Sequence, residues 1–142
     1  MRAFISTYDG LEAPEGSDFA QNLARLGCDI ESSPSSPHTS SSHEDPRWAT
    51  WNSEGLPAAI RRADIFIALI PDSSVYGSST WMASEFGEAF CRFQEHGSPK
   101  LYVYQLDPTA LPAGFKSYVS ASQRLPSDPT RAAELIVAES QL

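Results

Sequence analysis

The sequence predicts an α/β domain built on a mostly parallel sheet, because candidate strands and helices alternate along almost the whole chain. The clearest strand, residues 64–70, is apolar nearly throughout, as is typical of a central strand that helices cover on both faces. A helix with one apolar stripe is expected to follow it at about residues 81–95. Right-handed crossovers between such strands predict a doubly wound, flavodoxin-like α/β/α arrangement with four or five strands.

The remaining elements follow from the same patterns. Residues 2–8 are predicted to form the first strand and residues 9–16 a loop, after which Ser17 caps a helix that Gly27 ends. Further expected elements are a short strand at 28–31, helical segments within 47–63, a strand at 100–106, a short strand at 118–122 and a helix that opens at Asp128-Pro129.

The organisation is expected to be that of a single domain. A chain of 142 residues leaves no room for a second core of ordinary size, so residues 1–142 are predicted to fold together. Residues 32–46 are rich in serine and proline and almost free of apolar side chains, which predicts a long surface loop. Such a loop can also serve as a substrate lid or as a partner-binding arm.

The charge and composition exclude several functional classes. With 10 basic and 18 acidic residues, the formal net charge is -8, which disfavours binding to nucleic acid and to anionic membranes. No apolar run is long enough to span a bilayer, and the N-terminus turns polar too soon for a signal peptide. Two cysteines provide no disulfide framework, so a cytoplasmic location is expected. The three histidines show no ligand spacing, so no metal site is expected.

Ligands in such folds bind outside the carboxyl ends of the strands, which directs attention to the residues there. The chain has no phosphate-binding glycine loop, no dinucleotide fingerprint and no nucleophile elbow. A carboxylate remains: Glu85 is expected just over one turn into the helix that follows the central strand, with Glu88 one turn further along the same side. A glutamate early in a helix is also favoured by the helix dipole alone, so a solvated role without chemistry stays open.

A motif around this glutamate resembles a known family. The segment Tyr76-Gly77-Ser78-Ser79-Thr80-Trp81-Met82-Ala83-Ser84-Glu85 resembles the Y-x-x-S-x-W-x-x-x-E element of Toll/interleukin-1 receptor (TIR) domains. The opening Phe4-Ile5-Ser6 and the stretch Ala59-Ile60-Arg61-Arg62-Ala63-Asp64 resemble segments at the first and third strands of that family. The resemblance covers roughly the first two-thirds of the chain, and the family's fold is flavodoxin-like.

The TIR resemblance implies a chemistry for Glu85. In enzymatic TIR domains the matching glutamate is catalytic, and it contacts the ribose beside nicotinamide while the glycosidic bond of NAD breaks. Their products, ADP-ribose or cyclic isomers, can act as signals in bacterial defence. NAD or another nucleotide is then the substrate, and no cofactor is expected.

A second family competes for the same residue. Glu85-Phe86-Gly87-Glu88-Ala89 resembles the E-x-G-x-A of nucleoside 2-deoxyribosyltransferases and related nucleotide N-hydrolases, whose glutamate is a nucleophile. The D-x-G-T that usually precedes that glutamate is not reproduced in register here. Both resemblances place Glu85 at the anomeric carbon of a nucleotide sugar, where a carboxylate stabilises the positive charge of an oxocarbenium-like transition state.

Other side chains are candidates for binding the substrate. Aromatic stacking, hydroxyl contacts and ribose hydrogen bonds suggest a set that comprises Ser6, Tyr8, Asp9, Trp48, Asp72, Ser79 and Trp81. Core packing remains the alternative for the two tryptophans, and turn capping for the two aspartates. Arg47 and the pair Arg61-Arg62 are candidates to meet a diphosphate.

A non-catalytic reading also stays open. Many TIR domains act by binding one another, so a homo-oligomer or a separately encoded effector protein is a possible partner. The sequence alone chooses neither the nucleotide nor the outcome among hydrolysis, cyclisation and transfer.

Overall fold

The computed structural model of the chain describes residues 1–7, 14–32, 60–70, 79–106 and 122–140. Within them lies one sheet, formed by β1 (Arg2–Thr7), β2 (Asp29–Ser32), β3 (Ile65–Ile70), β4 (Lys100–Gln105) and β5 (Gln123–Arg124). The strand order is β2-β1-β3-β4-β5, and every neighbouring pair is parallel. This is the flavodoxin-like order, so the predicted fold class is confirmed.

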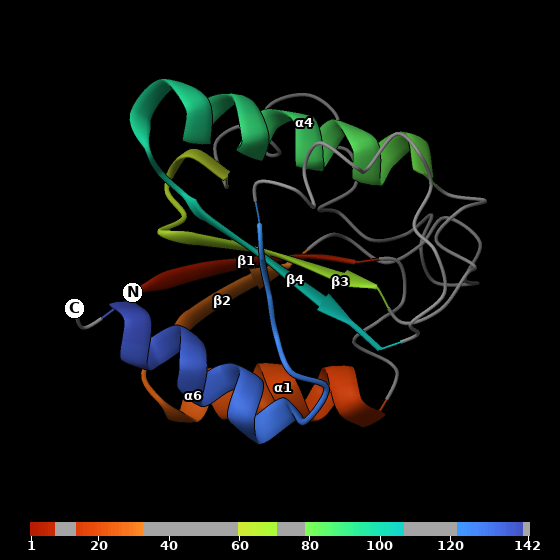
Figure 1. Ribbon diagram of the computed structural model, residues 1–142, viewed down its shortest axis with the longest axis vertical. Coiled ribbons are helices and arrows are strands. Elements are labelled where there is room, and N and C mark those ends of the chain that lie inside the picture. The colour runs from red at the N-terminus through yellow and green to blue at the C-terminus, as the bar shows by residue number, and fades with distance from the viewer. Residues whose placement is uncertain (8–13, 33–59, 71–78, 107–121, 141–142) are drawn as a thin grey trace, which may run out of the picture.

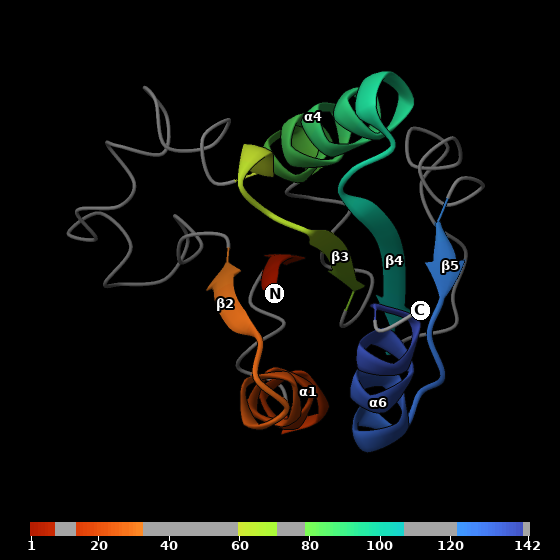
Figure 2. The ribbon, with the colours of Figure 1, turned by 90° about the vertical axis from the view of Figure 1, so that its left-hand side faces the viewer.

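Helices cover both faces of the sheet and complete the three layers (Figure 1). Helices α1 (Pro14–Arg25) and α6 (Pro129–Ser140) lie side by side on one face, and α4 (Ser79–His96) crosses the other face (Figure 2). No helix in the described part of the chain combines the length and the apolar character that crossing a bilayer requires.

One hydrophobic core cluster lies between the sheet and the α1–α6 pair. Side chains of a strand alternate between faces, and Ala3, Ile5 and Thr7 of β1 alternate with Phe4 and Ser6. Ala3 and Ile5 belong to this cluster, which also contains buried side chains of β3, β4, α1 and α6. The residues of β3 are buried on both faces, as the apolar run predicts for a central strand.

Aromatic rings seat α4 on the opposite face. The rings of Phe4 and Phe66 stack with centroids 5.5 Å apart, and Phe86 of α4 meets Phe66 edge-on at 6.0 Å. All three side chains are buried. Edge-to-face and offset-stacked arrangements are the favoured geometries for such pairs, so this cluster fixes how the first half of α4 lies over β1 and β3.

Two glycines follow the ends of helices α1 and α4. Gly27 follows α1 with φ of 99°, and its amide donates to the carbonyl of Ala24. Gly97 follows α4 with φ of 73° and donates to the carbonyl of Phe93. A left-handed residue just after a helix is nearly always glycine, because a side chain there is strained.

The start of α1 differs from its prediction. The helix begins at Pro14 rather than after Ser17, so Ser17 is not the cap but lies in the first turn, where its hydroxyl accepts a hydrogen bond from Gln21. Proline suits the first helical position because its fixed φ is already helical and its missing N–H would have no partner there. Glu15 adds a negative charge close to the positive helix end.

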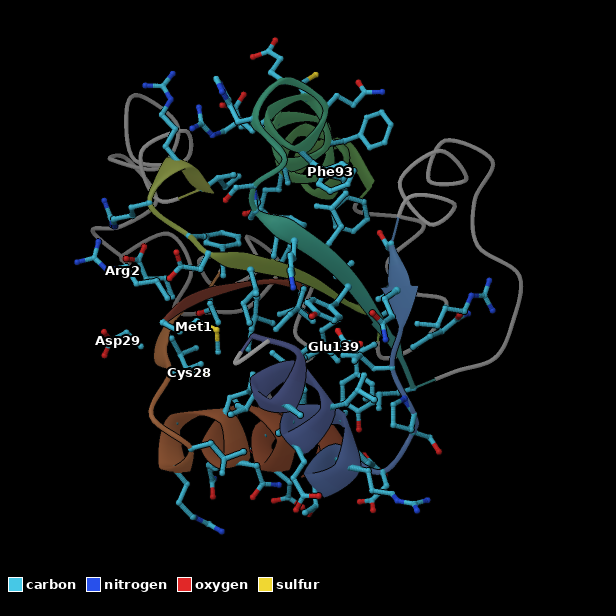
Figure 3. The ribbon with its side chains drawn as sticks, turned by 60° about the vertical axis from the view of Figure 1, so that its left-hand side comes forward. Met1, Arg2, Cys28, Asp29, Phe93 and Glu139 are labelled. Carbon is cyan, nitrogen blue, oxygen red and sulfur yellow. The ribbon has the colours of Figure 1, made fainter. Side chains whose placement is uncertain are left out.

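The last described strand begins directly after the range predicted for it, most of which lies outside the described residues. β5 comprises Gln123 and Arg124, and of the predicted strand at 118–122 only Ser122 is described, as a bend. A polar network explains this location: Glu139 of α6 accepts hydrogen bonds from the Tyr102 hydroxyl at 2.7 Å and the Gln123 amide at 2.6 Å. Figure 3 shows Glu139 on α6. These contacts tie β5 to both β4 and α6, a tertiary cause that local apolar patterning does not reveal.

The segment at 47–63 falls mostly outside the described residues. Residues 60 and 61 of that segment are described and helical, and the helix ends there. Ile60 is fully buried. Residues 33–46 of the serine-rich stretch also lie outside the described part, and Ser32 is the last residue of β2.

Candidate active site

A buried polar pair lies on the α4 face of the sheet. The hydroxyl of Ser6 on β1 donates a hydrogen bond of 2.6 Å to Oε1 of Glu85 on α4. Both side chains are 0% exposed, and they are, with Thr7, the buried polar side chains among the described residues. A buried carboxylate is costly unless hydrogen bonds satisfy it, so this contact is part of what allows Glu85 to lie here.

The parallel sheet explains how residues so far apart in sequence meet. Ser6 lies near the carboxyl end of β1 and pairs in register with Ala68 of β3. The chain leaves β3 at the same edge of the sheet and returns over it as α4, which contacts β1 and β4. Because Ala68 is small and fully buried, the face beside Ser6 offers room for a carboxylate from the helix above.

The structure decides one alternative that the sequence leaves open. Glu85 is not a solvated residue of a helix terminus, since its side chain has no exposed surface. The helix begins at Ser79, two residues earlier than predicted, so Glu85 lies in its second turn, where the helix dipole is weaker than in the first. Full burial gives its carboxyl group a low-dielectric setting, in which electrostatic effects are strong.

The second acid of the helix lies in a different setting. Glu88 is only partly buried, one turn beyond Glu85. It is therefore a glutamate of the same helix that differs from Glu85 in burial, which makes it a matched control for substitution.

Most of the other predicted substrate contacts lie where the structure describes no side chain. Tyr8, Asp9, Trp48 and Asp72 lie outside the described residues. The backbones of Ser79 and Trp81 lie in α4, but no side chain of that helix is described before Glu85. Ser6 is described, and the contact of its hydroxyl is with Glu85.

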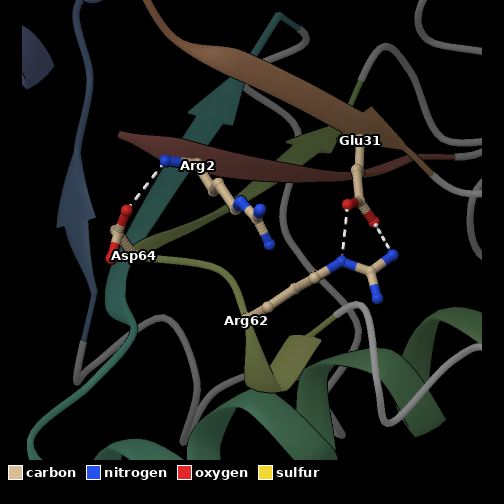
Figure 4. Close-up of polar contacts among 4 residues, drawn as sticks. All are labelled: Arg2, Glu31, Arg62 and Asp64. Atoms are coloured by element: carbon tan, nitrogen blue, oxygen red, sulfur yellow. Dashed lines mark hydrogen bonds and ion pairs between the residues drawn. The ribbon is translucent and has the colours of Figure 1, made fainter.

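The two arginines considered for a diphosphate, Arg61 and Arg62, lie away from the pair of Ser6 and Glu85. Both arginines precede β3, so they lie at the amino-terminal edge of the sheet, opposite to the edge at which Ser6 and Glu85 meet. Arg62 donates two hydrogen bonds to Glu31 of β2, at 2.8 and 2.9 Å, and these raise the pKa of its guanidinium (Figure 4). Asp64 at the same edge accepts from the backbone amide of Arg2 at 2.8 Å.

Comparison with known proteins shows a distant structural similarity. No protein-family model and no curated protein sequence matches the chain. Among solved structures, the chain is similar to the CMP N-glycosidase BcmB of Clostridium botulinum, at 12% sequence identity and a TM-score of 0.49. The match covers 96% of this chain and 99% of that chain. At this level of similarity the activity of the neighbour does not transfer to this chain.

A pocket on β4 and β5 contains a residue that sequence reasoning missed. Val103, Gln105, Arg124 and Leu125 line a cavity of about 200 Å³ that is open to solvent. Gln105 lies near the end of the strand predicted at 100–106, but nothing near Arg124 in the sequence marks that arginine as a site residue. Only the pairing of β5 with β4 brings this arginine to the sheet.

The described residues offer no ready metal site. They contain no group of three histidine, cysteine, aspartate or glutamate side chains placed to hold an ion together.

Proposed function

We propose that this chain is an enzyme that cleaves the bond between nicotinamide and ribose in NAD, and that Glu85 acts at the anomeric carbon. The observation that carries the proposal is the buried pair of Ser6 and Glu85, in which a hydroxyl donates a hydrogen bond to a carboxyl group with no exposed surface. The TIR-like motif that ends at Glu85 supports the choice of NAD.

The proposed mechanism needs few groups. When the bond between the ribose anomeric carbon and the nicotinamide nitrogen breaks, its electron pair moves to the ring nitrogen, which loses its positive charge. Nicotinamide therefore leaves without a general acid. The ribose ring becomes oxocarbenium-like, and the Glu85 carboxylate stabilises that charge. Water then adds to the anomeric carbon to give ADP-ribose, or a hydroxyl or base nitrogen of the same substrate adds to give a cyclic product.

Burial of the pair has a consequence for access. Because neither Ser6 nor Glu85 has exposed surface, a nucleotide reaches the carboxylate only when neighbouring groups move aside. Assembly of several copies is one event that supplies such a movement. Activity is therefore measured at both low and high protein concentration, and a steep rise of specific activity with concentration supports this part of the proposal.

A second reaction uses the same carboxylate. The segment from Glu85 to Ala89 resembles that of nucleoside 2-deoxyribosyltransferases and nucleotide N-hydrolases, which favours a purine or pyrimidine as the leaving base. In that case Glu85 attacks the anomeric carbon as the bond to the base breaks, and the electron pair goes to the base, which takes a proton from solvent. The covalent sugar intermediate is then resolved when water or a second base displaces the Glu85 carboxylate and gives up a proton to solvent.

The test is release of a free base. The purified protein is incubated with NAD and, separately, with nucleosides and nucleoside monophosphates, and the products are separated by chromatography. Release of nicotinamide supports the proposal, whereas release of a purine or pyrimidine supports the second reaction. Silence on every substrate by a folded protein contradicts both and favours a non-catalytic interaction module.

Substitution assigns the activity to the site. Glu85→Gln keeps the size and the hydrogen-bond acceptor of the side chain but removes its charge, and we expect base release to fall at least about 100-fold. Glu88→Gln removes the same charge one turn away on a less buried position and is expected to retain activity. Equal activity of Glu85→Gln and the parent protein contradicts the role of Glu85.

A further inference from the structure

We infer that the pocket at Val103, Gln105, Arg124 and Leu125, defined here as the β4–β5 pocket, binds a phosphate of the substrate. The inference rests on the proposed function, because it places this phosphate on a nucleotide whose sugar lies at Glu85. It assigns the substrate to phosphorylated nucleotides, as opposed to free nucleosides.

The sheet register connects the pocket to the candidate active site. Ser6 pairs with Ala68, Ala68 pairs with Val103, and Val103 pairs with Arg124. These four residues form one row across β1, β3, β4 and β5. Partners in register share a face, so the row runs along the α4 face, on which Ser6 meets Glu85. Three steps between neighbouring strands separate the Cα atoms of Ser6 and Arg124 by about 14 Å.

That separation suits a nucleotide. The distance of about 14 Å is bridged from both ends. The Arg124 side chain extends from one end of the row, and the ribose and phosphate of the substrate extend from the other. The cavity of about 200 Å³ is several times the share of liquid volume that one water occupies, about 30 Å³, so a phosphate group fits. Gln105 adds an amide to the lining near the carboxyl end of β4.

The charge distribution singles out Arg124 among the described cations. Four of the others, Arg2, Arg61, Arg62 and Lys100, precede or begin strands at the amino-terminal edge. Figure 3 shows Arg2 there, beside Asp29. Arg25 ends α1, Arg131 belongs to α6 on the other face, and Arg92 lies two turns beyond Glu85 along α4.

Arg124 is also available to a ligand. Its side chain is exposed, and it is paired with no acid in the part of the chain that the structure describes. In a chain with a net charge of -8, an arginine that no acid of the described residues neutralises is a favourable place for an anion. The planar guanidinium can donate two parallel hydrogen bonds to a phosphate, which makes arginine well suited to this role.

The first test compares substrates that differ only in phosphate. Nicotinamide mononucleotide is compared with nicotinamide riboside, and cytidine monophosphate with cytidine, which covers both candidate reactions. In Arg124→Gln we expect the preference for the phosphorylated member, taken as the ratio of kcat/KM values, to fall about 10- to 100-fold. Arg131→Gln, an exposed cation on the opposite face, is the matched control and keeps the preference. An unchanged preference in Arg124→Gln overturns the inference.

The second test does not depend on any activity. Arginine Nε–H signals of the isotopically labelled protein are followed by NMR during titration with inorganic pyrophosphate, and the Arg124 signal is assigned by its loss in Arg124→Gln. We expect a saturable shift of the Arg124 signal that exceeds any shift of the Arg131 signal. If the two signals move alike, the pocket is not an anion site. If Arg124 shifts while no substrate is cleaved, the proposed reaction fails and the subsite remains.

Discussion

The side chains of Ser6 and Glu85 lie 79 residues apart in the chain, yet their oxygen atoms are 2.6 Å apart in the fold. The hydroxyl belongs to the sheet and the carboxylate to the helix above it, so the hydrogen bond links two layers of the domain. Because both side chains are fully buried, Glu85 has little freedom to turn, and Ser6 is placed to set the orientation of its carboxylate.

Substitution of Ser6 tests this positioning role. Ser6→Ala removes the donor of a charge-assisted hydrogen bond worth about 1.5–3 kcal/mol, and we expect kcat for base release to fall about 10- to 100-fold. KM is expected to change little, because the hydroxyl contacts Glu85 and not the substrate. Ser6→Cys, which keeps the shape and a weak donor, should recover part of kcat. A direct role of Ser6 in binding substrate would instead raise KM, and a wild-type kcat in Ser6→Ala would exclude positioning.

Phe66 tests the seating of α4. Its ring contacts Phe4 within the sheet and Phe86 on the helix, so Phe66→Ala leaves a cavity beneath α4. We expect the free energy of unfolding, measured by urea denaturation, to fall by about 3–5 kcal/mol. Phe66→Leu fills more of the space and is expected to cost less. Phe93→Ala, at a partly exposed position of the same helix, is the control, and an equal loss in both alanine variants would argue against a special role of Phe66.

The phenol of Tyr104, on the α1–α6 face of the sheet, predicts how stability changes at alkaline pH. Burial, together with the charges of Glu15, Asp128 and Asp18, raises the pKa of Tyr104 from 10.0 to about 12, and its hydroxyl donates to the carbonyl of Ser127. A raised pKa means that the fold favours the neutral phenol. The stabilisation is therefore fully present below pH 10 and is lost as the pH rises towards 12.

The corresponding measurement is urea denaturation at a series of alkaline pH values. We expect the free energy of unfolding of the parent protein to decline between pH 10 and 12, and the decline to be shallower in Tyr104→Phe, which has no phenol to ionise. Burial and the hydrogen bond to Glu139 also raise the pKa of Tyr102. Tyr102 therefore contributes a decline of its own, which persists in Tyr104→Phe. Parallel pH profiles of the parent and Tyr104→Phe would contradict the prediction.

The sequence by itself determined the fold class and the central residue of the proposed site. The apolar run of β3 requires cover on both faces, and its alternation with amphipathic helices leaves a parallel doubly wound sheet as the natural arrangement. Glu85 was identified from the motif that ends at it, because a contiguous motif can be recognised without information on distant contacts.

Only the tertiary structure decided the surroundings of that glutamate. Whether Glu85 faces water or the sheet depends on how α4 rotates over β1 and β3, and the aromatic cluster around Phe66 sets that rotation. Strand order and register determine three further features. They set the hydrogen-bond partner of Glu85, the position of Arg61 and Arg62 at the amino-terminal edge of the sheet, and the row of residues from Ser6 to Arg124. These depend on pairings between segments far apart in sequence, which local periodicity does not encode.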